Sequence, residues 1–230
     1  MPPHELPVPD AAALATSAAL SARIREEIAH AGGWIGFDRY MDLALHAPGL
    51  GFYAAGARKF GAGGDFVTAP ELGPLFARTL ARQVAEIFGH APANVLELGA
   101  GSGALAAELL DELAALGTPP ASYAILETSA SLRERQRERL GTRVGWLDTL
   151  PSRFAGVVIA NEVADAIPVR AFARTKEGFV ERGVTFSEDA FAWADREAPQ
   201  DLTAAAEALG VAIPGDTRYE SEIGLAPRAW

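Results

Sequence analysis

The sequence predicts an α/β fold of the doubly wound, Rossmann-like type, with a parallel sheet at its centre. Two features support this prediction. From residue 94 onward, short apolar runs alternate with amphipathic segments, and strands that alternate with helices build parallel sheets. The first of these runs leads into the glycine-rich turn Gly99-Ala100-Gly101-Ser102-Gly103, at the edge of the sheet where such folds bind their ligands.

The composition is that of a folded protein with an acidic surface. The 230 residues are 49% hydrophobic, which is enough for one full core with appendages. A formal net charge of −10 argues against nonspecific binding to nucleic acid or to anionic membranes. Cysteine is absent and the four histidines have no ligand spacing, so we expect no metal site. Because no export signal or membrane span is recognisable, we expect a cytoplasmic protein.

The N-terminal part is predicted to be a flexible tail and then a helical and loop region. Residues 1–16 are rich in proline and alanine and form the expected tail. Residues 17–92 follow, and we expect this region to close over the ligand site. A helix is predicted from Ser17 to the glycine pair at 32–33, and an ordered, aromatic-rich loop is predicted from Trp34 to Pro70.

Pro74 is predicted to lie in the first turn of a further helix that ends at Gly89. The spacing of apolar residues predicts its buried face, which comprises Leu75, Phe76, Leu80, Val84, Ile87 and Phe88. This helix brings the chain to the first strand of the core.

Residues 93–170 are predicted to form the α/β core. Four strands are expected, over residues 94–98, 123–126, 143–147 and 155–160, with helices over 105–116 and 132–140. The fourth strand is apolar enough to be buried on both faces. Residues 171–230 are expected to be an insertion, with short strands at 178–186 and 190–193 and a helix over 202–209. A doubly wound domain needs strands beyond the fourth, so we expect the chain to be C-terminally incomplete.

The glycine turn is the first candidate for a binding site. Gly99, Gly101 and Gly103 allow a ligand to approach the backbone at the start of a helix, where amide groups attract it. With Ala104, the same glycines also satisfy the dinucleotide fingerprint G-x-G-x-x-G/A. The glycines alone therefore leave two cofactors open, NAD and S-adenosylmethionine (SAM).

Acidic residues at the ends of the first three strands are candidates for cofactor contacts, and Glu97 among them favours SAM. Glu97 stands two residues before Gly99, where it would repel a pyrophosphate but suit the ammonium and sulfonium groups of SAM. Glu127 follows the second strand, in reach of two ribose hydroxyls. Asp148 follows the third strand and can meet the adenine amino group, although a role in the turn is an equal alternative.

A polar segment after the fourth strand is the candidate for acceptor chemistry. Asn161, Glu162 and Asp165 stand at the mouth where open α/β sheets bind ligands. Glu162 and Asp165 are three residues apart, so on a helical turn they share a face and can clamp a cationic acceptor. The alternative is a helix cap with solvated acids. We predict a catalytic role for all three residues and cofactor contact for Asn161.

Several separated segments carry recognisable motifs. They are Gly32 to Phe37 with Tyr40-Met41, Pro48 to Tyr53, Gly64 to Glu71 (G-D-F-x-T-x-P-E), Glu97 to Gly103, Ala160 to Val169 (A-N-E-x-x-D-A-[LI]-P-V), and Arg218 to Glu222. Together these segments resemble the MidA family of bacterial and mitochondrial methyltransferases, formerly a domain of unknown function. The match covers residues from about Ser17 to Val169 and the end of the chain. Departures at His46 and at Val163-Ala164 leave the substrate open.

The resemblance implies a SAM-binding α/β domain with helical and small-sheet insertions. It implies that Thr68 and Pro70 line the methionine end of the cofactor, that Glu97, Gly99 and Gly101 form the loop, and that Glu127 holds the ribose. In the mitochondrial branch an arginine of a complex I subunit is symmetrically dimethylated. The implied partner is thus a protein with an exposed arginine, and we also expect that the chain can form a homodimer.

Two other functions are weighed against methyl transfer. One is a catalytically silent assembly factor that grips a partner through the aromatic-rich loop. The other is an NAD-dependent oxidoreductase, for which no Tyr/Lys or His/Asp pair has a spacing typical of hydride chemistry. Cofactor binding separates the second alternative from methyl transfer, and turnover separates the first.

Overall fold

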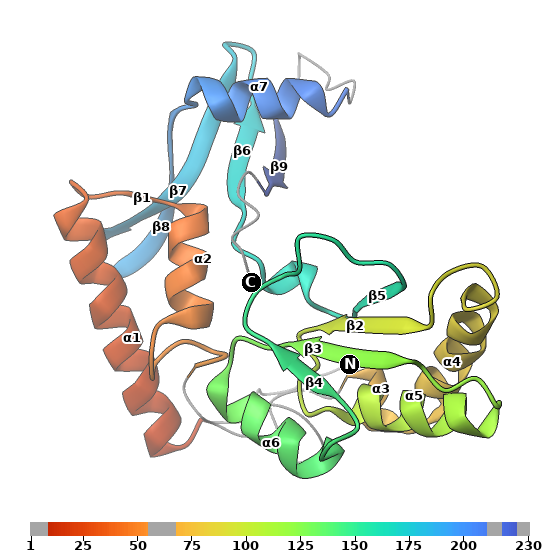
Figure 1. Ribbon diagram of the computed structural model, residues 1–230. Coiled ribbons are helices and arrows are strands. Elements are labelled where there is room, and N and C mark those ends of the chain that lie inside the picture. Colours follow the sequence, from red (N-terminus) through yellow and green to blue (C-terminus); the bar gives the residue numbers. More distant parts are fainter. Residues whose placement is uncertain (1–8, 55–67, 211–217, 225–230) are drawn as a thin grey trace, which may run out of the picture. The chain divides into compact units, whose positions relative to one another are not determined.

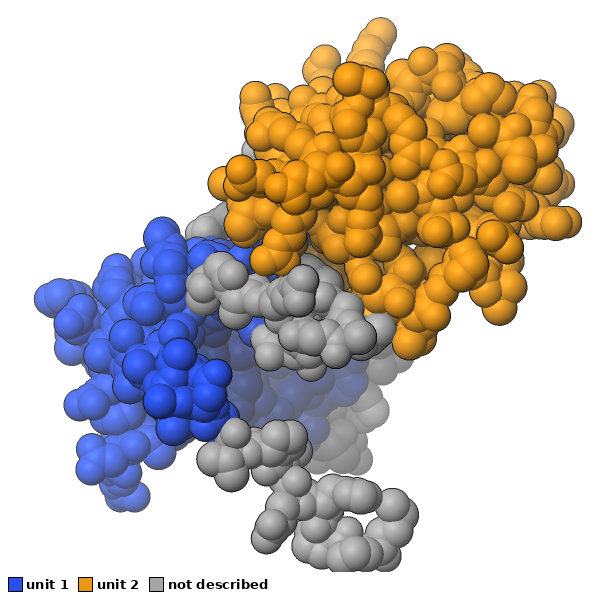
Figure 2. Space-filling view, turned by 90° about the horizontal axis from the view of Figure 1, so that it is seen from below, with its two compact units in different colours: residues 1–55, 167–226 blue, residues 56–166, 227–230 orange. Residues whose placement is uncertain are grey.

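A computed structural model of the protein describes residues 9–54, 68–210 and 218–224. These residues divide into two compact units, coloured blue and orange in Figure 2. Unit 1 holds the described residues up to 54 and those from 167 onward, and unit 2 holds residues 68–166. The segment expected at 17–92 is therefore divided: its first part shares a sheet with residues beyond 167, and its last part joins the α/β core.

Unit 2 is an α/β unit around a parallel sheet (Figure 1). Its elements are α3 (Ala69–Leu72), α4 (Leu75–Ile87), β2 (Asn94–Leu98), α5 (Ala104–Ala115), β3 (Ser122–Leu126), α6 (Ala130–Leu140), β4 (Gly145–Leu147), β5 (Val157–Ala160) and the short 3-10 helix η1 (Ala164–Ala166). The strands lie in the order β4-β3-β2-β5, and every pair is parallel. This arrangement confirms the predicted Rossmann-like class and all four predicted core strands.

The strand order places the candidate site. From β2 the chain adds β3 and then β4 on one side, and it returns to add β5 on the other side of β2. The neighbouring strands β2 and β5 therefore form the switch point of the sheet, where open α/β sheets bind ligands beyond the carboxyl ends of the strands. The glycine turn follows β2 and the polar segment follows β5, so the topology brings both to this point.

The core of unit 2 lies between one face of the sheet and the helices. Val95, Ile125 and Ile159 from the strands pack with buried residues of α4 and α5. On α4 the buried residues are the small ones, Ala77, Ala81 and Val84, whereas Leu75, Phe76 and Ile87 are exposed. The predicted face of this helix was therefore wrong in part, because a stripe of small side chains, four and three residues apart, is what packs on the core.

The fourth core strand is less enclosed than predicted. Ile159 of β5 is buried, but Val158, on the opposite face, is 54% exposed. Within the described part of the chain, β5 pairs only with β2 and stands at the edge of the sheet. An apolar run of this kind predicts the strand correctly, but its burial depends on neighbours that its own sequence does not encode.

Unit 1 is built on an antiparallel sheet with three helices (Figure 1). Its elements are α1 (Ala11–His30), β1 (Ile35–Gly36), α2 (Phe37–His46), β6 (Arg170–Arg174), β7 (Phe179–Ser187), β8 (Ala190–Glu197), α7 (Gln200–Ala208) and β9 (Tyr219–Ile223). The strands predicted near 178–186 and 190–193 and the helix near 202–209 are confirmed. The charged strands β6 and β9 were not predicted.

Two predictions for the N-terminal part need correction. The first helix begins at Ala11, inside the expected tail, because the Asp10 side chain caps it by accepting a 2.7 Å hydrogen bond from the Ala13 amide. The expected loop from Trp34 to Pro70 contains the helix α2, whose Leu43 is buried in the core of unit 1. Residues 55–67 of that segment lie outside the described residues.

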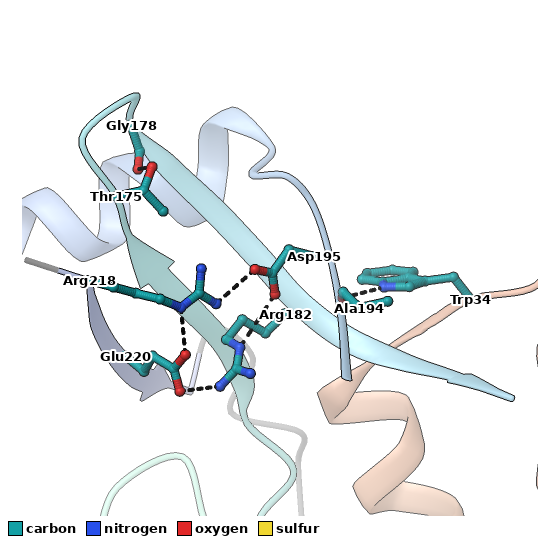
Figure 3. Close-up of polar contacts among 8 residues, drawn as sticks. All are labelled: Trp34, Thr175, Gly178, Arg182, Ala194, Asp195, Arg218 and Glu220. Atoms are coloured by element: carbon teal, nitrogen blue, oxygen red, sulfur yellow. Dashed lines mark hydrogen bonds and ion pairs between the residues drawn. The ribbon is translucent and has the colours of Figure 1, made fainter. Parts of the chain in front are cut away.

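Polar contacts tie the strands of unit 1 together (Figure 3). Arg182 of β7 forms ion pairs with Asp195 of β8 and with Glu220 of β9, and Arg218 completes the ring by pairing with both acids. The indole of Trp34 donates a 2.8 Å hydrogen bond to the carbonyl of Ala194. Each of the two guanidinium groups pairs with both carboxylates, so the charges of the network are balanced within the sheet.

Candidate functional site

All three glycines of the turn adopt the left-handed conformation that glycine tolerates best. Their φ angles are +59° at Gly99, +55° at Gly101 and +77° at Gly103. A Cβ at Gly99 would stand 3.1 Å from a methyl of Val163, in the segment after β5. A Cβ at Gly103 would stand 3.3 Å from a methyl of Leu140 on α6. Gly99 and Gly103 therefore lie close to the β5 segment and to α6, where an added side chain would crowd Val163 or Leu140.

Glu97 is a carboxylate buried beneath this turn. It is 2% exposed and lies in register with Ile125 of β3 and Ile159 of β5, on the face that carries the core. The Tyr123 hydroxyl donates a 2.8 Å hydrogen bond to Glu97 Oε2. Burial raises the pKa of Glu97 to about 7, the hydrogen bond from Tyr123 acts to lower it, and the charge of Glu127 raises it.

Glu127 is the second buried carboxylate at the turn, directly after β3. Its Oε1 accepts a 2.9 Å hydrogen bond from the Ser129 amide, and its Oε2 accepts a 3.0 Å hydrogen bond from Gln136 Nε2. Burial raises the pKa of Glu127, whereas the hydrogen bonds from Ser129 and Gln136 act to lower it. The structure thus brings both predicted acids, Glu97 and Glu127, to the glycine turn.

Gln136 is a residue of this site that sequence reasoning missed. The segment over 132–140 was read as a charged surface helix, and its glutamine carries no sequence signal that distinguishes it from its charged neighbours. In the structure its side chain is fully buried and also donates to the carbonyl of Gly101 at 2.9 Å. Only its position on the inner face of α6, opposite the charged side chains, could have pointed to it.

The segment with Thr68 and Pro70 is linked to the turn by its last residue. Glu71 of α3 accepts a hydrogen bond from the hydroxyl of Ser102, which also accepts one of 3.0 Å from Arg139. Thr68 is the N-cap residue of α3, and Pro70 lies in its first turn. The motif T-A-P-E is therefore held next to the glycine turn, whereas residues 64–67 of the same motif lie outside the described residues.

The polar segment after β5 is also at the turn, but not in the predicted geometry. Asn161 is partly buried, Glu162 and Asp165 are exposed, and the buried Val163 between them contacts the position above Gly99. Glu162 has φ +52° and precedes η1, which holds Asp165. The two acids therefore do not share a helical turn, because the left-handed backbone at Glu162 redirects the chain before the helix starts.

Glu162 has an unusual backbone for its residue type. Among the described residues, the other non-glycine positions with positive φ are Glu188 and Asp189, which form the two-residue turn between β7 and β8. A hairpin turn of this kind requires positive φ at both positions. Glu162 lies in no hairpin, and strained conformations of this sort gather at functional sites.

Asp148 lies apart from the buried carboxylates. Its side chain is 86% exposed and forms a 2.7 Å ion pair with Arg133 of α6, which also donates to the carbonyl of Leu147. The contact with adenine therefore stays a prediction, and a role in holding the end of β4 is what the structure shows. In the parts of the chain that the structure describes, no three His, Asp or Glu side chains gather as a metal site.

These residues fit a nucleoside ligand that carries positive charge. The positive-φ glycines let a ligand approach the backbone of the turn, Glu127 has oxygens for a diol, and the buried Glu97 before the turn suits a cation rather than a pyrophosphate. The fold and the site together define a Rossmann-like domain for a cationic nucleoside cofactor. A family model described as "Putative S-adenosyl-L-methionine-dependent methyltransferase" matches residues 79–230. The chain belongs to this family, whose cofactor is SAM, and the resemblance to MidA-like methyltransferases is confirmed.

Solved structures and curated relatives agree with this assignment. A crystal structure from Burkholderia thailandensis, bound to S-adenosyl-homocysteine, is 53% identical with a TM-score of 0.80, over 88% of this chain and 56% of that one. A native crystal structure from the same organism is 49% identical with a TM-score of 0.82, over 96% of this chain and 59% of that one.

Two animal proteins named as mitochondrial also match. The protein arginine methyltransferase NDUFAF7 homologue of Caenorhabditis elegans is 28% identical over 65% of this chain and 42% of its own length. The protein arginine methyltransferase NDUFAF7 of Danio rerio is 29% identical over 66% of this chain and 43% of its own length. The chain thus spans less than half the length of these relatives. No helix within the described ranges has the length and apolar character that a membrane crossing needs.

Proposed function

We propose that unit 2 binds SAM at the glycine turn and that the protein transfers its methyl group to an arginine of a partner protein. The observation that carries the proposal is the pair of buried acids, Glu97 and Glu127, beside three left-handed glycines. A dinucleotide would bring its pyrophosphate to this turn, where Glu97 would repel it, whereas Glu127 suits a ribose diol. Glu97 attracts the ammonium and sulfonium groups of SAM.

Each part of the cofactor has a candidate partner in the site. The glycine turn leaves space for the nucleoside, and Glu127 accepts from the two ribose hydroxyls. Glu97 balances the positive charge of the methionine end, which Thr68 and Pro70 line. Asn161 and Asp148 complete the proposed cofactor contacts at the mouth and at the adenine. When bound, SAM supplies a methyl group on a sulfonium, which is already an activated leaving group.

The chain's own task is to position the acceptor. A guanidinium keeps its charge at neutral pH, so an exposed carboxylate orients it through paired hydrogen bonds. Glu162 and Asp165 are exposed beside the turn, and Val163 ties their segment to Gly99. We assign to Glu162 the orientation of the guanidinium and the acceptance of its proton as the new N–C bond forms, with Asp165 as the second acid.

An arginine of a protein fits this site better than an anionic acceptor. The chain has a formal net charge of −10, which favours cationic partners. The two curated relatives carry names of protein arginine methyltransferases, and this supports the choice of acceptor. Homodimer formation, closure of the N-terminal region over the cofactor and a cytoplasmic location stay predictions, the last because both relatives are named as mitochondrial.

Calorimetry with SAM tests the cofactor. We expect binding that Gly101→Val abolishes, because a branched side chain is strained at φ +55° and would distort the turn. The matched control is Gly145→Val, at a strand position with open space above it, which should leave binding unchanged. NAD should not compete. Binding of NAD in place of SAM would overturn the proposal.

A transfer assay then tests the acceptor. The protein is incubated with SAM labelled on the methyl group and with arginine-containing and lysine-containing peptides, and methylarginine is detected by mass spectrometry. We expect label on arginine only. SAM binding without transfer to any protein would favour the alternative of a catalytically silent binding factor.

A further inference from the structure

Gln136 joins three separate parts of the cofactor site. Its side chain projects from α6 and is fully buried. The Nε2 group donates to the carbonyl of Gly101 at 2.9 Å and to Glu127 Oε2 at 3.0 Å. The Oε1 atom accepts a 3.0 Å hydrogen bond from the indole of Trp146 on β4. One side chain therefore connects the glycine turn, the acid after β3 and the strand β4.

The orientation of this amide is determined by its partners. An amide nitrogen has two protons to donate, and both are used, one on a carbonyl and one on a carboxylate. The reversed amide would place its oxygen against these two acceptors and its nitrogen against the donor of Trp146. Trp146 thus selects the orientation in which the amide bridges the other two groups.

The amide of Gln136 holds close together two hydrogen-bond acceptors that would otherwise repel each other. The Gly101 carbonyl and the Glu127 carboxylate have no proton to share between them, and both lie beside the same buried nitrogen. Loss of the amide would remove the donor that these two buried oxygens share, which is costly in a medium of low dielectric. The carboxylate would then turn or take up a proton.

We propose that Gln136 is a positioning residue that fixes the Glu127 carboxylate against the glycine turn and thereby determines recognition of the ribose hydroxyls. This inference rests on the proposed binding of SAM. Ser129 donates to Oε1 of Glu127 and Gln136 donates to Oε2, and the backbone amides of Gly101 and Thr128 also donate to this carboxylate. Donors from the turn, from α6 and from the end of β3 thus hold the carboxylate in one orientation, as recognition of a diol requires.

The test compares S-adenosyl-homocysteine with its 2′-deoxy analogue by calorimetry on the full chain. Hydrogen bonds to a charged group are each worth roughly 10- to 100-fold in affinity, so the wild type should prefer the 2′-hydroxyl by about this factor. In Gln136→Met, which keeps the volume but donates nothing, the preference should fall to about 3-fold or less. Gln83→Met, at an exposed position of α4, is the matched control and should keep the full preference.

A second variant separates positioning from simple support of the fold. Gln136→Glu keeps an acceptor for Trp146 but places a second carboxylate beside Glu127, so it should also lose the preference for the 2′-hydroxyl. Circular dichroism checks that both variants fold. An unchanged preference in folded Gln136→Met would overturn the inference, as would unfolding of both variants, which would assign Gln136 to structure alone. If the wild type itself binds no S-adenosyl-homocysteine, the proposed function fails instead.

Discussion

The Tyr123 hydroxyl donates a 2.8 Å hydrogen bond to Glu97 Oε2, and the sheet buries both side chains. In the parallel register Tyr123 stands opposite Val95, two residues before Glu97, so the two side chains share one face of the sheet. This pair gives the cofactor site a buried acid with a raised pKa and a single neutral hydrogen-bond donor. The titration of Glu97 can be followed both in the stability of the protein and in cofactor binding.

Glu97→Gln should stabilise the cofactor-free protein relative to the wild type. This gain in stability should be larger at neutral pH than at acid pH. Burial raises the pKa of Glu97 from 4.5 to about 7. A buried acid with a raised pKa does not destabilise the folded protein below the pKa of the unfolded state, because it is protonated in both states. As the pH rises further the destabilisation grows, and it becomes constant once the pH passes the pKa of the folded state. The advantage of the variant should therefore grow by ~3 kcal/mol between about pH 4.5 and pH 7.

Chemical unfolding at several pH values measures this difference. Glu86→Gln, at an exposed position of α4, is the control and should show no such trend. A difference between Glu97→Gln and wild type that is constant over this pH range would contradict the assignment of the raised pKa to Glu97.

Tyr123→Phe should move the pH dependence of SAM binding upward. The hydrogen bond from Tyr123 acts to lower the pKa of Glu97, so its removal raises that pKa further above about 7. Because the ionised acid is the form that attracts SAM, binding weakens below the pKa, and the midpoint should rise by roughly one to two pH units. Calorimetry with SAM over a pH series measures the midpoint, and Tyr219→Phe in unit 1 is the control. An unshifted midpoint would remove Tyr123 from this role.

Gly99→Ala should cost more than its backbone strain alone. The matched variant is Gly117→Ala, because Gly117 has φ +74°, in the left-handed cap that ends α5, and open space where a Cβ would stand. A left-handed alanine costs about 1–2 kcal/mol at either position. At Gly99 the added methyl also meets Val163 at 3.1 Å, so we expect a larger loss of stability there and loss of SAM binding only there. Thermal unfolding and calorimetry on both variants test this, and equal effects would show that the contact with Val163 carries no weight.

The parts of the site that follow strands were predictable from the sequence. Strong apolar runs located β2 and β3, and a parallel sheet places the residues after such strands at one edge, so Glu97, Glu127 and the glycines were found from position alone. Gln136 was not predicted, because the buried face of a helix is known only once its packing partners are known. Glu162 and Asp165 were predicted to share a helical turn, and this was wrong because the backbone at Glu162 adopts an angle that is rare for glutamate.

The fold of unit 1 was less predictable for a related reason. Its sheet joins β1, near the start of the chain, to β7, and such distant pairing leaves no local signal. The strands β6 and β9 carry charged residues, and these find partners inside unit 1, as Arg170 does in its ion pair with Glu181. Because charged side chains occupy partly buried positions, the sequence of these strands does not show a clear apolar pattern. The helix α2 was hidden among aromatic residues that are as typical of loops and strands as of helices.

Glu162→Gln should slow methyl transfer far more than it weakens SAM binding. The carboxylate is proposed to orient the acceptor and take its proton, and loss of such a group typically lowers turnover by about 10²-fold or more. It is exposed and has no proposed contact with the cofactor, so the dissociation constant of SAM should change by about 2-fold or less. Single-turnover transfer to an arginine peptide and calorimetry measure the two quantities.

Glu188→Gln is the matched control for this variant. Glu188 is also an exposed glutamate in the left-handed conformation, with φ +50° against +52° at Glu162, but it forms the turn between β7 and β8. Any effect of removing a charge from a strained position is therefore common to both variants, and only an effect on turnover is specific to Glu162. Equal losses of turnover and of SAM affinity in Glu162→Gln would place this residue in the cofactor pocket and leave Asp165 as the acid that faces the acceptor.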